Sequence, residues 1–228
     1  MNQNITIYGS GRLGQAIAKY FPGAVMIDKE TKDKKVLLLN SDNIIVTCRG
    51  KSKLKIGSTA LETRMNELLD NILGIDELRT TMGDSKKDLT VVTNSVDLVA
   101  RYLQESLPLA RVRAFGLAVD KYRFSEYLGV DVDVVGFHGE AIPVLDLKDE
   151  QEYIRIMERV NEISLHNFVN NGINYDLCSK IFFEDFNEPY RPTQKVRLND
   201  VEQRILERTK AKFELSYQTF IKERAETF

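Results

Sequence analysis

The turn GSGRLG, at residues 9–14, combines residue types and a spacing that could bind a phosphate-containing ligand. Gly9 permits a tight turn, Gly11 lets the backbone approach a pyrophosphate, and Gly14 lets the following helix pack closely on the preceding strand. A helix that begins here presents unpaired backbone N–H groups to phosphates. The candidate cofactor-binding residues of the turn are Gly9, Gly11, Arg12, Leu13 and Gly14.

A carboxylate follows the next apolar run, as the fingerprint of a dinucleotide-binding βαβ unit requires. Asp28 comes directly after Ala24-Val25-Met26-Ile27 and is placed to accept hydrogen bonds from the hydroxyls of an adenosine ribose. Its charge would repel a 2′-phosphate, so the sequence favours NAD over NADP. The alternative is a βαβ unit without a ligand, in which Asp28 only opens the charged segment 28–35.

The alternation of strand-like and helix-like runs predicts that this turn lies in an α/β unit with a parallel sheet. The expected strands lie at 5–8, 24–27, 43–48, 89–93 and 112–117. The expected helices lie at 15–20, 59–73 and 96–107. Gly74 is a plausible stop for the second of them. Only about fifteen residues connect Asp28 to the third strand, just above the ~12 that a parallel crossover needs.

The second half of the chain has a different pattern. We expect helices at 120–128, 149–171 and 199–226, a β-branched run at 130–137, and irregular residues at 184–192. Gly172 is a natural C-cap, and Asn199 or Asp200 could cap the last helix. We therefore predict a reduced Rossmann-like domain at 1–117, followed by a smaller, mostly helical α+β substrate domain at 118–228.

Composition excludes several classes of protein. The 228 residues are 43% hydrophobic, enough for one large domain or two small ones, and the net charge of -2 gives no global attraction to nucleic acid or membranes. Cys48 and Cys178 lack the spacing of metal ligands, which favours a reduced, cytoplasmic protein without a metal site. The start of the sequence argues against a secretory signal, and no apolar run approaches the ~20 residues of a membrane span.

Five segments, in order along the chain, resemble the lactate/malate dehydrogenase family. They are GSGRLGQAIA at 9–18, LETRMNELLDN at 61–71, VVTNSVDLVARYL at 91–103, LAVDKYRFSEYLGV at 117–130 and VVGFHGEAIPVL at 134–145. Their common order is more specific than any single match. The resemblance implies an enzyme that transfers hydride between NAD(H) and a small 2-oxo or 2-hydroxy acid.

The resemblance also implies roles for five side chains. His138 would be the general base in oxidation and the general acid in reduction, because the imidazole pKa lies near neutrality. Asp120 would orient this ring and stabilise its charged form. Arg123 would bind the substrate carboxylate through two hydrogen bonds. Arg64 would polarise the 2-oxo carbonyl, and Asn94 would orient the substrate.

Each of these residues has an ordinary explanation when it is taken alone. Asp120 and Arg123 are spaced i,i+3, as in a surface ion pair on a helix. His138 could be a satisfied loop histidine, Asn94 could cap the next helix, and Arg64 could be a solvated side chain. Their joint occurrence in family order favours the functional interpretation.

The sequence departs from the family in several places, among them the basic loop at 49–58, which does not align cleanly. The segment after Asp28 is short, the β-rich section before the last helix is nearly absent, and Ser95 replaces a proline that follows a cis peptide bond. A cis bond without proline costs ~3 kcal/mol, so we expect this turn, and Asn94 with it, to be rearranged. The short segment removes the family's dimer surface, so an oligomer would use another interface.

Two other functions remain open. A non-catalytic descendant could keep the fold as a binding or structural module. An NAD-dependent glycosidase has a similar glycine turn but needs a metal-binding Cys/His pair, and neither Cys48 nor Cys178 has a convincing setting for one. The complete charged set favours the dehydrogenase.

Overall fold

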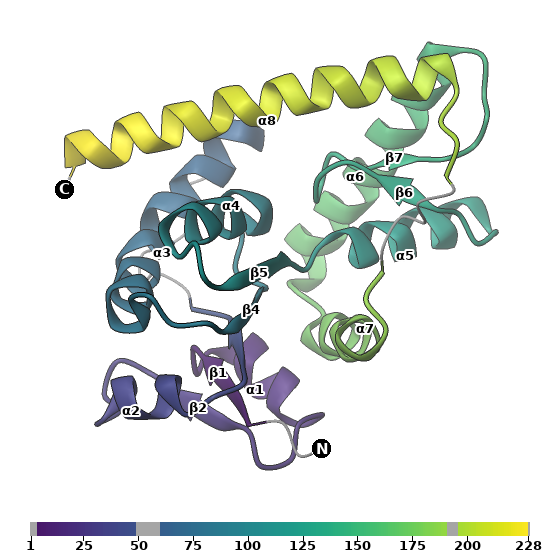
Figure 1. Ribbon diagram of the computed structural model, residues 1–228. Coiled ribbons are helices and arrows are strands. Elements are labelled where there is room, and N and C mark those ends of the chain that lie inside the picture. Colours follow the sequence, from purple (N-terminus) through teal and green to yellow (C-terminus); the bar gives the residue numbers. More distant parts are fainter. Residues whose placement is uncertain (1–3, 49–59, 191–195, 228) are drawn as a thin grey trace. The chain divides into compact units, whose positions relative to one another are not determined.

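The computed structural model describes residues 4–48, 60–190 and 196–227, with Arg64 among those described by backbone alone. The chain forms two compact units (Figure 1). Unit 1 contains Met1–Phe115 and Ser216–Phe228, and unit 2 contains Gly116–Leu215. The boundary near residue 116 lies close to the predicted one at 117, whereas Ser216–Phe228 groups with the first unit rather than the second.

Unit 1 contains a parallel sheet of five strands in the order β2-β1-β3-β4-β5. The strands are β1 Ile5–Tyr8, β2 Val25–Ile27, β3 Asn43–Val46, β4 Asp88–Val91 and β5 Arg111–Ala114. Ile7 and Ile45, which pair across β1 and β3, are both fully buried because helices cover the sheet. The Rossmann order is 3-2-1-4-5-6. If its third strand is removed and the remaining strands are renumbered along the chain, it becomes the order found here. The predicted reduced Rossmann-like sheet is therefore confirmed.

The helices of unit 1 are α1 Arg12–Ala18, α2 Lys34–Leu39, α3 Ala60–Met82 and α4 Val96–Ser106. The expected stop of α3 at Gly74 is wrong. The apolar face of the helix continues through Ile75 and Leu78, which are fully buried, so packing overrides the local signal. A Cβ on Gly74 would lie 3.6 Å from Cys48 Sγ, so the glycine lies where α3 passes close to the end of β3.

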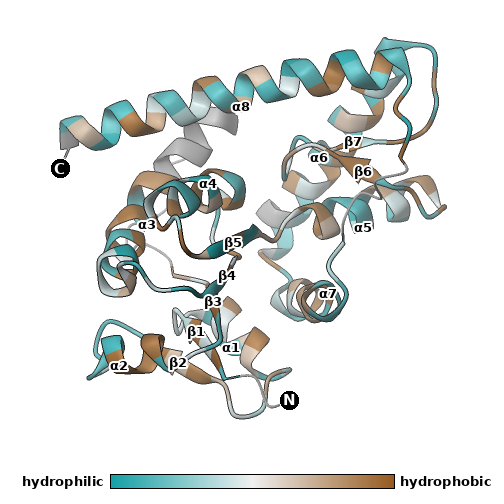
Figure 2. Ribbon diagram, in the orientation of Figure 1, coloured by the Kyte–Doolittle hydropathy of each residue, from teal (hydrophilic) through white to brown (hydrophobic). Residues whose placement is uncertain are grey.

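The end of the last helix, α8 Asp200–Thr227, completes the core of unit 1. Phe220 is fully buried and meets Tyr102 of α4 edge to face, with ring centroids 5.7 Å apart. Tyr217 donates a hydrogen bond of 2.6 Å to Glu105, and Arg224 pairs with Asp76 at 3.0 Å. Figure 2 shows that α8 is largely hydrophilic, with apolar residues recurring along it.

Unit 2 is smaller and mostly helical, as predicted. It contains α5 Leu117–Leu128, β6 Val134–Val135, β7 Ile142–Pro143, α6 Glu150–Asn171, α7 Tyr175–Asn187 and the first part of α8. Only two residues of the β-branched run at 130–137 form a strand, and β6 pairs antiparallel with β7. Helix α7 extends into the segment 184–192 that was expected to be irregular.

The first turn of α8 is held by a reciprocal cap. Oδ1 of Asn199 accepts the N–H groups of Val201 and Glu202, while Oε2 of Glu202 accepts the N–H of Asn199 at 2.8 Å. The other oxygen of Glu202 accepts the Tyr153 hydroxyl at 2.5 Å and the Leu145 N–H at 3.0 Å. Burial and this carboxylate raise the pKa of Tyr153 to about 12. The cap therefore ties α8 to α6 and to the segment after β7.

Candidate active site

The glycine turn is packed tightly against the end of β3. Gly9 has φ 127°, a conformation that favours glycine, and its N–H donates to the Ile27 carbonyl at 2.8 Å. A Cβ here would lie 2.6 Å from the Cys48 nitrogen. Oγ1 of Thr47 donates to the Gly9 carbonyl at 2.9 Å. No larger residue could replace Gly9 without moving the backbone.

The other two glycines differ in what surrounds them. A Cβ on Gly14 would lie 2.1 Å from the Gly9 carbonyl oxygen, so α1 packs directly on the turn. Nothing lies within 4 Å of a Cβ placed on Gly11. Arg12, the exposed first residue of α1, and half-buried Leu13 follow it. The backbone at Gly11 is therefore open to approach by a ligand.

Asp28 directly follows β2, and hydrogen bonds fix the orientation of its carboxylate. Oδ1 accepts the Thr31 hydroxyl at 2.8 Å and the Glu30 N–H at 3.0 Å, and Oδ2 accepts the Ser10 hydroxyl at 3.4 Å. These bonds, chiefly that of Thr31, hold the pKa of Asp28 below its ordinary value. The carboxylate is thus exposed, ionised near neutral pH and linked to the glycine turn through Ser10.

Asn94 follows β4, and its side chain is exposed. Its carbonyl accepts the side-chain N–H of Asn71 at 2.7 Å. The Asn94–Ser95 peptide bond is cis, so the expected rearrangement of this bond does not occur. Ser95, not Asn94, holds the N-cap position of α4. The Arg64 side chain lies outside the described part of the chain.

The glycine turn, Asp28 and Asn94 each follow the carboxyl end of a strand of the sheet. The turn follows β1, Asp28 follows β2 and Asn94 lies shortly after β4. Because the strands are parallel, their carboxyl ends lie on the same edge of the sheet. Open α/β sheets bind ligands at this edge.

Unit 2 brings Asp120, Arg123 and His138 into one cluster. Oδ2 of Asp120 lies 2.9 Å from Nδ1 of His138 and accepts the Gly139 N–H at 2.9 Å. Oδ1 accepts a guanidinium N–H of Arg123 at 3.2 Å. The Asp120 side chain is only 4% exposed, so this is not the solvated surface ion pair that the i,i+3 spacing alone suggests.

The environment of Asp120 favours its ionised form. Burial alone raises the pKa of this carboxyl, but the charges and hydrogen bonds of His138 and Arg123 and the Gly139 N–H outweigh burial. Together they hold the pKa of Asp120 below its ordinary value. An ionised carboxylate can only accept, so Nδ1 of His138 is the donor, and Nε2 is the acceptor when the ring is neutral.

The backbone explains how these three residues meet. Asp120 and Arg123 lie one turn apart on α5, so their side chains share a face of the helix. His138 lies at the tip of the β6–β7 hairpin, which is shaped by Gly136 at φ 105° and Gly139 at φ 76°. Arg123 is 35% exposed, so its guanidinium extends from the buried carboxylate towards solvent.

Several supporting residues could not be assigned from the sequence. Ser10 and Thr31 hold Asp28, and the Asp-x-x-Thr spacing is a recognisable turn signal that could have indicated the second. The Gly139 N–H has no such signal. Cys178 of α7 lies near Arg123; burial raises the pKa of this thiol, and the arginine partly offsets that effect.

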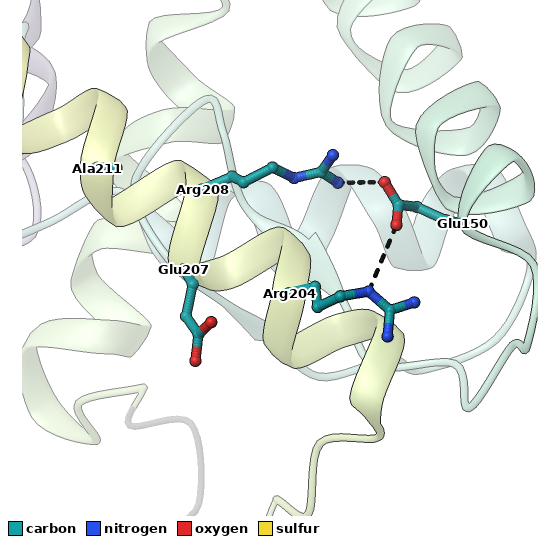
Figure 3. A pocket seen from close by; sticks show the side chains of 5 residues that line it. All are labelled: Glu150, Arg204, Glu207, Arg208 and Ala211. Atoms are coloured by element: carbon teal, nitrogen blue, oxygen red, sulfur yellow. Dashed lines mark hydrogen bonds and ion pairs between the residues drawn. The ribbon is translucent and has the colours of Figure 1, made fainter.

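A shallow pocket elsewhere in unit 2 is lined by charged residues of α6 and α8. Figure 3 shows Glu150 bridging Arg204 and Arg208. The Arg204 Nε lies 3.8 Å from the carboxylate, and Arg208 pairs with its other oxygen. This pocket contains none of the residues that the sequence singles out for chemistry.

Within the described residues, the structure shows neither a group of side chains that could hold a metal ion nor a helix that could cross a membrane. No group of three or more His, Cys, Asp or Glu side chains in 4–48, 60–190 and 196–227 could hold a metal ion. Among the helices of that same part of the chain, none combines the length and apolar character required to cross a membrane.

Neither a protein-family model nor a curated protein matches the sequence, but solved structures match the fold. The lactate dehydrogenase MGS-M5 from a Medee basin deep-sea metagenome library superposes with a TM-score of 0.73 at 14% identity, over 96% of this chain and 99% of that one. The apo malate dehydrogenase of Picrophilus torridus gives 0.72 at 15% identity, over 99% of each chain. The malate dehydrogenase of Archaeoglobus fulgidus in complex with NADH gives 0.70 at 14%, over 95% and 99%.

The sheet order and the glycine turn define the class as a Rossmann-type α/β protein. More specifically, the chain has the lactate/malate dehydrogenase fold over nearly its whole length, which confirms the resemblance. At these identities the similarity establishes the fold, and the chemistry must be argued from the site.

Proposed function

We propose that the protein is an NAD-dependent 2-hydroxy acid dehydrogenase of the lactate/malate type. The observation that carries this proposal is the buried Asp120 carboxylate, which joins His138 and Arg123 in a chain with this fold. A histidine held by an acid, beside an arginine, supplies an acid–base group and a carboxylate-binding group within one cluster.

The residues of unit 1 fit NAD. The open backbone at Gly11 admits a pyrophosphate, while Gly9 and Gly14 keep the turn compact. The exposed Asp28 carboxylate can accept the ribose hydroxyls, with Arg12 and Leu13 flanking the phosphates. When bound, NAD supplies the acceptor or donor of hydride, and the protein supplies binding, orientation and electrostatics.

The acid–base step belongs to His138. In oxidation, Nε2 takes the proton of the substrate hydroxyl as hydride leaves the same carbon; in reduction, the same nitrogen returns the proton to the 2-oxygen. Asp120 keeps the proton on Nδ1 and stabilises the imidazolium. The ionised state of Asp120, favoured by its lowered pKa, is the state that this role requires.

Arg123 is suited to hold the substrate carboxylate. It gives one N–H to Asp120, and the guanidinium has five donors, so a carboxylate can be bound through two others. We propose that Arg64 polarises the 2-oxo carbonyl and that Asn94 orients the substrate. The partner is then a small-molecule 2-oxo acid, with no role for nucleic acid or a membrane.

Two broader properties are part of the same proposal. A reduced, cytoplasmic location suits two cysteines that are both free thiols. Any oligomer would use an interface other than that of the family, because the short crossover after Asp28 omits the segment that builds it.

The test is the loss of NADH absorbance with pyruvate, oxaloacetate and a panel of other 2-oxo acids. We expect turnover with at least one, and a decrease in kcat of about 10²–10⁴-fold in His138→Gln. The matched control is His166→Gln, which changes the other histidine of the chain, exposed on α6. Folded protein without turnover on any acid, and without NADH binding by fluorescence, would instead support the non-catalytic module.

A further inference from the structure

We infer that Phe213 of α8 is a positioning residue, which fixes the orientation of His138 through a stacked contact with Phe137. The predicted effect on the orientation of the imidazole depends only on the stacked contact, whereas the predicted effect on turnover rests on the proposed function.

The contact is close and nearly parallel. The rings of Phe137 and Phe213 lie 4.1 Å apart between centroids, with an interplanar angle of 6°. Phe137 immediately precedes His138, so its ring orients the peptide that carries the imidazole. Both phenylalanines are half-buried, and the contact lies within unit 2.

The hairpin tip needs support from outside because its backbone is permissive. Gly136 and Gly139, on either side of Phe137 and His138, both have positive φ. Glycine at such positions retains more conformational freedom than any other residue. Within the tip, the Glu140 N–H donates to the Phe137 carbonyl at 3.0 Å, which closes a turn but does not fix the side chains.

Helix α8 meets the tip at two points. Its Leu206 Cδ1 lies 3.8 Å from a Cβ placed on Gly136, and Phe213 stacks on Phe137. Leu206 and Phe213 are seven residues apart, which places them two turns apart on one face of the helix. One continuous surface of α8 therefore supports Gly136 and Phe137, the two residues that precede His138.

This support is itself anchored. The reciprocal cap of Asn199 and Glu202 fixes the start of α8, and Glu202 also binds the Tyr153 hydroxyl and the Leu145 N–H. Glu202 is 1% exposed, so these bonds are shielded from water. The imidazole is thus held from two sides: by Asp120 at Nδ1, and by Phe213 through Phe137.

A matched pair of substitutions tests the stack. Phe213→Leu keeps apolar volume but removes the ring, whereas Phe213→Tyr keeps the ring. Leu215→Ala, at a side chain 67% exposed on the same helix, is the control. We expect Phe213→Leu to lower kcat by about 10-fold or more with little change in KM, because misplaced catalytic groups act on the chemical step. Phe213→Tyr and Leu215→Ala are expected to stay within about twofold of the parent.

A second readout needs no turnover. The chain has two histidines, so His166→Gln assigns the imidazole NMR signals of His138. In that background, Phe213→Leu is expected to shift or broaden the His138 signals. Phe213→Tyr, which keeps the ring, is expected to leave them unchanged. If Phe213→Leu fails to fold, Phe137→Leu removes the same stack from the hairpin side and must give the same change.

The outcomes separate the two proposals. Unchanged His138 signals in folded Phe213→Leu or Phe137→Leu overturn the positioning role. Changed signals in a protein that turns over no 2-oxo acid overturn the proposed function and leave the positioning role intact. A loss of kcat in Leu215→Ala as large as that in Phe213→Leu would show that the effect is not specific to the stack, and would also overturn the positioning role.

Discussion

Nδ1 of His138 lies 2.9 Å from a carboxylate oxygen of Asp120, and the same oxygen accepts the N–H of the next residue, Gly139. The aspartate therefore holds both the side chain of the histidine and the backbone beside it. This double contact sets the ring plane and the tautomer together, because an ionised carboxylate in this position can only accept.

Replacing this carboxylate tests its role in catalysis. We expect Asp120→Asn to lower kcat by about 10³-fold or more, because the amide can donate to Nδ1 and favour the wrong tautomer. Steady-state kinetics with the best 2-oxo acid measure the effect. Asp131→Asn is the control, since that exposed carboxylate pairs with Lys121 at 3.0 Å. Equal losses in both variants would contradict a specific role for Asp120.

The lowered pKa of Asp120 also predicts how stability depends on pH. Near pH 4 the unfolded chain binds more protons at this site than the folded chain, so the free energy of unfolding increases with pH there. The contribution is complete above the unfolded pKa and is lost as pH falls through the lower folded pKa. Urea unfolding between pH 3 and pH 6 should show a shallower dependence in Asp120→Asn. Parallel curves for the two proteins would refute the assignment.

The glycine turn predicts that two similar substitutions differ in effect. Gly14→Ala puts a Cβ 2.1 Å from the Gly9 carbonyl oxygen, so we expect a loss of about 1–3 kcal/mol of stability together with weaker NADH binding. Gly11→Ala meets no atom within 4 Å, and φ there is -66°, so stability should be unchanged. NADH binding should still weaken, because the methyl group blocks approach to the backbone. Thermal unfolding and fluorescence titration measure both quantities.

Asp28 predicts the choice of cofactor. We expect Asp28→Ser to weaken NADH binding by about 10-fold and to narrow the gap to NADPH, because the charge that repels a 2′-phosphate is removed. Because the Asp28 side chain is exposed, we expect no large change in thermal stability. Titration of both reduced cofactors is the measurement, with Asp84→Ser, at another exposed aspartate, as the control. An unchanged ratio of the two affinities would argue against ribose binding by Asp28.

The short crossover after Asp28 predicts modest affinity for the cofactor as a whole. The adenine side of the site has little chain to cover it, so the NADH dissociation constant of the parent protein should exceed about 1 µM. A submicromolar value from the same titration would contradict this expectation.

The parallel sheet could be predicted because its central strands are continuous apolar runs, which are typical of strands covered by helices on both faces. The end of α3 could not, because Ile75 and Leu78 continue its apolar face beyond Gly74. Local glycine signals are weaker than such packing.

The candidate site was only partly predictable. The resemblance named His138 and Asp120 by type and order, but their contact depends on how the β6–β7 hairpin folds back towards α5. The stack of Phe137 on Phe213 joins residues far apart in sequence, and no local pattern indicates it. Contacts of this kind depend on tertiary packing alone.

The chain leaves unit 1 at Phe115 and returns to it at Ser216, so unit 2 is one uninterrupted segment and unit 1 is not. Tyr217 and Phe220, which are buried in unit 1, are synthesised after every residue of unit 2. Unit 1 therefore lacks part of its core until the last helix has been synthesised, whereas unit 2 contains no residue later than Leu215.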